Sequence, residues 1–206
     1  QPRWNGDLQT DKTIMIWREQ GLGDEILFYT CLPDLHETNL KIILECDPRL
    51  MDILKRRFPR FKIRPESIDS AFMPLFSDFD YQLALGSLPS LLRRKIHDFN
   101  KPSLTFSPLS NCVEEVKKRI RSYSSKVLVG ICWRSGLLTI DRNTNYTSLW
   151  DWEPILSNKN YQLVNLVHGD CEEELTEIEN KYCIDILRWA DFDLRNDLET
   201  VLALVS

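Results

Sequence analysis

The chain has 206 residues, of which 43% are apolar and 28% are charged, and its formal net charge is −5. This composition is typical of an ordinary folded protein, and the acidic balance argues against nucleic-acid binding because no strongly basic face can be presumed. No stretch approaches the roughly 18 consecutive apolar residues of a membrane span. The six cysteines and three histidines show no CxxC pair and no metal-ligand spacing, which favours reduced thiols, a cytoplasmic protein and no metal.

The first predicted element is a strand over residues 13–17, where the letters TIMIW are β-branched, aromatic or otherwise apolar. A turn with two glycines follows, Gly21 and Gly23, and then an acidic pair and an apolar run that predicts a helix. Glycine here can take positive φ and let a ligand come close. Asp24 is either the N-cap of the helix or a functional carboxylate, and spacing alone leaves both interpretations open. In the polar lead-in, Trp4 is expected to pack on the domain edge.

Strands alternate with helices in the rest of the first half. Residues 41–46 predict a strand buried on both faces, since the run is nearly all apolar. Asp47 is the expected N-cap of the next helix, with Pro48 at its first position. Further strands are predicted at 61–64 and 81–85. The alternation indicates a parallel sheet with helices on both faces, and ligands of such sheets bind at the carboxyl ends of the strands.

The second half predicts another unit of this kind. Residues 101–109 contain two prolines and little pattern, so we expect domains at 1–110 and 111–206. An amphipathic helix over 111–123 precedes a strand of the buried type at 127–133. The remaining predicted elements are a helix near residue 150, a strand at 162–167, a helix at 172–182, a short strand at 184–187 and a helix from 197. An ordinary doubly wound domain continues with further strands, so we expect the second domain to be incomplete at its C-terminus.

The Gly21-Leu22-Gly23-Asp24 turn, followed by an apolar helix with Pro33, resembles the amino-terminal signature of glycosyltransferases of the heptosyltransferase type. More closely, it resembles the glycosyltransferase-like domains that follow tetratricopeptide repeats in bacterial proteins. The residues that match those domains span nearly the whole chain: Pro2, Trp4, Gly6, 19–24, 41–50, 86–93 and 129–136.

This resemblance implies an α/β protein of two Rossmann-like, doubly wound domains, the glycosyltransferase B type. The acceptor, a carbohydrate or a protein, then lies against the first domain, and a nucleotide sugar lies in the second. The implied transfer is inverting and needs neither metal nor cofactor, and Asp24 inherits the role of general base. The residues implied on the acceptor side are Gln20, Gly21, Gly23, Glu25, Gly86 and Ser87. Tetratricopeptide repeats, if the parent protein has them, lie upstream.

The second domain supplies the expected donor contacts. Arg134, Ser135, Gly136 and Arg142 follow the strand at 127–133 and are predicted to bind the diphosphate, because arginine grips phosphate oxygens and backbone amides near a glycine can bind anions. His168, at the end of a later strand, is a possible nucleotide contact. A salt bridge for Arg134 and a structural role for His168 remain open alternatives.

The sequence departs from this family at two places. Residues 145–148 lack the basic residue that the family carries before a serine, and the family's donor segment would lie beyond residue 206. This chain alone is therefore expected to be weakly active or inactive. Glu19 and Glu25 are alternative candidates for the general base, although Glu25 is also placed where a carboxylate in the first turn of a helix interacts favourably with the helix dipole.

The alternative function is a noncatalytic interaction domain that retains the fold beside a repeat array. A nucleotide-dependent enzyme of another kind is disfavoured because Ile26 stands where GxGxxG needs its third glycine.

Overall fold

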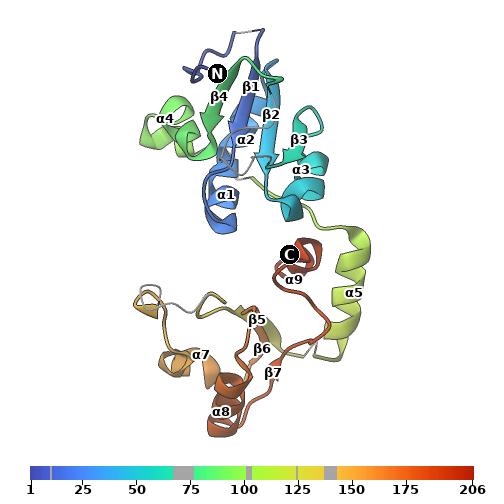
Figure 1. Ribbon diagram of the computed structural model, residues 1–206. Coiled ribbons are helices and arrows are strands. Elements are labelled where there is room, and N and C mark those ends of the chain that lie inside the picture. Colours follow the sequence, from blue (N-terminus) through green and yellow to red (C-terminus); the bar gives the residue numbers. More distant parts are fainter. Residues whose placement is uncertain (10, 67–76, 101–103, 124, 137–142) are drawn as a thin grey trace. The chain divides into compact units, whose positions relative to one another are not determined.

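A computed structural model describes residues 1–9, 11–66, 77–100, 104–123, 125–136 and 143–206. The chain divides into two compact units, Gln1–Ser107 and Pro108–Ser206. Each unit contains one parallel sheet with helices between its strands, which confirms the α/β class (Figure 1). No helix among the described residues is long and apolar enough to cross a lipid bilayer.

The first unit has a four-stranded parallel sheet in the order β3-β2-β1-β4. Strand β1 lies inside the sheet, so that Ile14 is aligned with Ile42 on one side and with Tyr81 on the other. The apolar runs predicted these strands to within one or two residues. The strands are β1 (Thr13–Trp17), β2 (Lys41–Cys46), β3 (Lys62–Pro65) and β4 (Tyr81–Ala84).

Helices α1 (Leu22–Phe28) and α2 (Leu32–His36) connect β1 to β2, α3 (Met51–Arg57) connects β2 to β3, and α4 (Leu88–Leu92) follows β4. A 3₁₀ turn over Pro48–Leu50 leads into α3, and Asp47 caps it by accepting a hydrogen bond from the Arg49 amide at 3.0 Å. The predicted cap is therefore confirmed. Ser87 precedes α4 but makes no side-chain cap bond.

The amino-terminal lead-in runs beside β4. The Trp4 amide donates to the Gln82 carbonyl at 2.9 Å, and the Gln82 amide donates to the Pro2 carbonyl at 3.0 Å. Trp4 is only 1% exposed, so this edge segment contributes one of the largest side chains of the core.

The second unit has a three-stranded parallel sheet in the order β5-β6-β7. Its core gathers side chains from the sheet and from α8, among them Ile131, Leu163 and Leu175. The described strands and helices are β5 (Val127–Ile131), β6 (Tyr161–Asn165), β7 (Ile186–Leu187), α5 (Ser110–Ile120), α7 (Glu153–Leu156), α8 (Glu172–Tyr182) and α9 (Leu198–Leu204).

Strand β5 corrects one expectation. Its sequence predicts a strand buried on both faces, but Val127 is 60% exposed and Leu128 is 37% exposed. Among the described residues β5 pairs only with β6, but this edge position alone does not explain the exposure, because the edge strand β7 of the same sheet is buried at Ile186 and Leu187. An apolar run predicts a strand but not which distant segments cover its faces.

Replacing Trp4 with alanine should destabilise the first unit by about 3–5 kcal/mol, because it removes a buried aromatic side chain and leaves a cavity. Urea unfolding followed by circular dichroism would measure this loss. Trp150→Ala is the control, since Trp150 is 42% exposed and its loss should cost less than about 1 kcal/mol. Equal losses in the two variants would contradict the burial of Trp4.

Candidate functional site

The glycine turn joins the carboxyl end of β1 to the start of α1. Gly21 is the N-cap residue, with φ −69° and ψ 166°, and the helix has no side-chain cap. Asp24 lies within the first turn of the helix, so the interpretation of Asp24 as the N-cap is wrong. Neither Gly21 nor Gly23 takes positive φ. The glycines provide space instead: a Cβ added to Gly23 would meet no atom within 4 Å.

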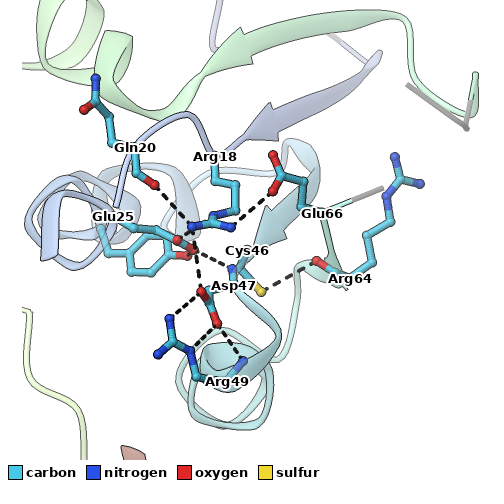
Figure 2. A network of polar contacts seen from close by, with 9 residues as sticks. Arg18, Gln20, Glu25, Cys46, Asp47, Arg49, Arg64 and Glu66 are labelled. Atoms are coloured by element: carbon cyan, nitrogen blue, oxygen red, sulfur yellow. Dashed lines mark hydrogen bonds and ion pairs between the residues drawn. The ribbon is translucent and has the colours of Figure 1, made fainter. Parts of the chain in front are cut away.

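Asp24 differs from the other carboxylates near this turn. It is exposed, and no hydrogen bond or ion pair joins it to any described residue. The Glu19 carboxylate accepts a hydrogen bond from the Gly86 amide at 3.0 Å. Asp47 is bound by Arg49, and Glu66 is bound by Arg18 (Figure 2). Asp24 therefore remains available to a ligand.

Glu25 is a buried carboxylate, only 1% exposed. One oxygen accepts hydrogen bonds from the Asp47 amide, at 2.8 Å, and from the Tyr29 hydroxyl. The other accepts from Arg18 Nε at 2.9 Å (Figure 2). This corrects the expectation of Glu25 on the acceptor side, because a side chain enclosed in this way cannot touch an acceptor. Glu25 also ceases to rival Asp24 as a base.

Gly86 belongs to the same edge of the sheet, as predicted. A Cβ at Gly86 would lie 2.7 Å from Glu19 Oε1 and 3.1 Å from the Phe28 ring, so a larger residue would push Glu19 away. The backbone after β4 can thus lie against the residues that precede the glycine turn. Ser87 follows in a half-buried position, and the Gln20 side chain points away from the Arg18 and Glu25 contacts (Figure 2).

The charged side chains next to the glycine turn are paired with one another. The Arg49 hydrogen bond is the main reason why the pKa of Asp47 lies below its usual range. Burial opposes the charge of Arg18, but Glu25, Glu66 and Asp47 outweigh it and raise the pKa of this guanidinium. Burial, followed by the nearby Glu25, raises the pKa of Tyr29. These groups hold the turn through fixed charges and a neutral phenol.

In the second unit, Arg134 is already paired. Its guanidinium donates to Glu174 on α8 and, at 2.8 Å, to the Asp170 carbonyl. Trp133 donates to the same Glu174 carboxylate at 3.2 Å. Arg134 borders a hollow of about 540 Å³ that Tyr146, Thr147 and Ser148 also line. Arg142 lies outside the described residues, so the predicted diphosphate set is only partly placed.

Gly136 and His168 come together although 31 residues separate them in the sequence. A Cβ on Gly136 would overlap the His168 ring and carbonyl, so this contact requires glycine. The half-buried Ser135 is the residue before it. Across the described part of the chain, no three His, Cys, Asp or Glu side chains gather as a metal site requires.

A cavity of about 460 Å³ lies at the carboxyl ends of β6 and β7 and includes His168 in its lining. Trp189 and Phe192 also line it, with ring centroids 5.3 Å apart, beside Arg188. The sequence analysis missed Trp189. The available signal was its place just after a short predicted strand, where parallel sheets bind ligands.

The chain is thus an α/β protein of two parallel-sheet units. The first unit has an exposed carboxylate, Asp24, in the turn after β1, and the second has a cavity with aromatic lining at the carboxyl ends of β6 and β7. No family model matches the chain, and no solved structure matches it. The chain is similar to Protein FlbA of Caulobacter vibrioides, with 29% identity over 216 residues that include 99% of this chain and 36% of FlbA. The chain therefore spans about a third of the length of that relative.

The pairing of Asp47 should make stability depend on acid pH. Because the pKa of folded Asp47 is depressed, its contribution is present above the unfolded value of about 3.9 and is lost as pH falls through the lower folded value. Wild type should therefore exceed Asp47→Asn in unfolding free energy at pH 6, and this advantage should shrink toward about pH 2. Urea titrations at several pH values would measure it. A constant difference across that range would contradict the assignment.

Proposed function

We propose that this chain is a glycosyltransferase-like pair of domains of the glycosyltransferase B type, acting by an inverting, metal-independent transfer. The donor is a nucleotide sugar, and the acceptor is a hydroxyl group of a carbohydrate or protein. The single observation that carries the proposal is the Asp24 carboxylate, which is exposed at the glycine turn after β1 and has no hydrogen-bond or ion-pair partner among the residues that the structure describes. The neighbouring carboxylates Glu19, Glu25 and Asp47 each accept hydrogen bonds.

The proposed chemistry uses Asp24 as general base. An acceptor hydroxyl approaches over the open space beside Gly23, and Asp24 removes its proton as the oxygen attacks the anomeric carbon. The bond from that carbon to the nucleoside diphosphate breaks, and the diphosphate leaves with the electron pair. A base of this kind must reach the hydroxyl within hydrogen-bond distance, which a buried carboxylate such as Glu25 cannot do.

The donor belongs, in this proposal, to the second unit. The cavity beside His168 has an aromatic wall at Trp189 that suits the flat face of a nucleobase. Gly136 closes against His168, so the loop after β5 is close to this cavity and can bring backbone amides toward a diphosphate. A nucleotide-sugar donor and free cysteines both fit a cytoplasmic protein.

One observation favours the alternative, a noncatalytic interaction domain. Arg134, predicted to bind phosphate, donates instead to Glu174 and to the Asp170 carbonyl. A diphosphate would have to displace Glu174 to reach this guanidinium. The relative FlbA is about three times as long as the matched region.

Asp24→Asn should lower the rate of sugar transfer by about 10²–10⁴-fold, because the amide cannot accept the acceptor proton. The assay follows release of the nucleoside diphosphate from UDP-, GDP- and ADP-sugars by the protein. Asp52→Asn is the matched control, since Asp52 is an exposed first-turn aspartate of α3 in the same unit. Equal rates for wild type and Asp24→Asn would exclude Asp24 as the base.

The donor cavity can be tested without turnover. A nucleotide sugar at 100 times its dissociation constant should stabilise its unit by about 2.7 kcal/mol, which a thermal-shift assay detects. Trp189→Ala should abolish the shift, whereas Trp150→Ala on another surface should not. If no nucleotide sugar raises the melting temperature of the protein, the noncatalytic function is supported instead.

A further inference from the structure

The backbone of the glycine turn has a specific anchor. The Arg18 guanidinium donates to the Gln20 carbonyl at 3.2 Å, to Glu25 Oε2 at 2.9 Å and to Glu66 Oε2 at 3.1 Å (Figure 2). Arg18 therefore hydrogen-bonds to the glycine turn, to the first helical turn of α1 and to the segment that follows β3. No other side chain among the described residues hydrogen-bonds the backbone of residues 20–24.

Glu25 binds both the Arg18 side chain and the backbone of the turn. Its own amide donates to the Gly21 carbonyl at 3.0 Å, and its carboxylate binds Arg18, the Asp47 amide and Tyr29. The carboxylate is thereby joined to the residues that directly follow β1 and β2 and to the 3₁₀ turn that follows α1. A carboxylate that is buried and fully hydrogen-bonded has few alternative positions.

The turn has little else to hold it. Two glycines give it a high conformational entropy when it is released, and no side chain caps α1. Asp24 makes no hydrogen bond or ion pair with a described residue that would orient its carboxylate. The position of Asp24 therefore depends on the backbone between Arg18 and Glu25.

We propose that Arg18 and Glu25 are positioning residues that hold the turn over residues 20–24, and with it the Asp24 carboxylate, at the carboxyl edge of the sheet. Their relevance to transfer rests on the proposed function, but their hold on the turn does not. Neither residue contacts the acceptor. Both act through the backbone that carries Asp24.

The test compares two buried ion pairs of the same sheet. R18M/E25Q removes both charges, while the glutamine oxygen can still accept from the Asp47 amide. The matched control R64M/E45Q removes the buried Arg64–Glu45 pair, whose 2.9 Å contact lies away from the turn. Removing both charges of a buried pair is often tolerated, unlike removing one.

Amide hydrogen exchange, read residue by residue by NMR, measures the hold directly. R18M/E25Q should speed exchange of the Glu25 amide roughly tenfold or more, while the Leu44 amide in β2 keeps its protection. R64M/E45Q should leave the Glu25 amide unchanged. Unchanged exchange at Glu25 in R18M/E25Q would overturn the proposal.

If R18M/E25Q does not fold, R18K replaces it in the exchange experiment. Lysine keeps the charge beside Glu25 but lacks the planar fork that reaches the Gln20 carbonyl.

A kinetic measurement separates this inference from the proposed function. In the transfer assay, R18M/E25Q should lower kcat with little change in KM. A loosened turn in a protein that transfers no sugar would support the positioning role and refute the transferase. Wild-type kcat and KM in R18M/E25Q would refute the positioning role and leave the transferase standing.

Discussion

The buried pair of Glu25 and Arg18 is the interaction on which the glycine turn depends. Taking a carboxylate out of water costs several kcal/mol unless hydrogen bonds and an opposite charge compensate it. Glu25 receives that compensation from Arg18 after β1, the Asp47 amide after β2 and Tyr29 in the 3₁₀ turn that follows α1. The pairing therefore joins two strand ends and a helix, and it leaves the adjacent Asp24 facing outward.

Local patterns predict much of the fold. The apolar run at 41–46 predicts a strand buried on both faces, the pair Asp47-Pro48 predicts a helix start, and residues 172–182 predict a helix that the structure has at those bounds. Each signal needs only neighbouring residues. Burial of β5 is different, because it depends on which distant segments cover its faces, and its exposed Val127 has the same residue type as the buried Val164.

The candidate site is only partly predictable for the same reason. Asp24 and Glu25 are adjacent acidic residues and look equivalent in the sequence, yet they point about 100° apart on a helix, so that one is exposed and the other buried. Which one faces the sheet depends on Arg18 and Asp47. Likewise, the pairing of Arg134 depends on Glu174, which lies 40 positions later on α8. In both units the chemically notable groups lie after strands, as parallel sheets predict.

The most direct test of this account is carboxyl footprinting with carbodiimide and glycine ethyl ester, read by fragment-ion mass spectrometry of the peptide that carries both Asp24 and Glu25. Asp24 is expected to be modified rapidly in the folded protein while Glu25 is protected, and this difference should disappear in denaturant. Equal modification of the two carboxylates in the folded protein, or preferential modification of Glu25, would contradict it.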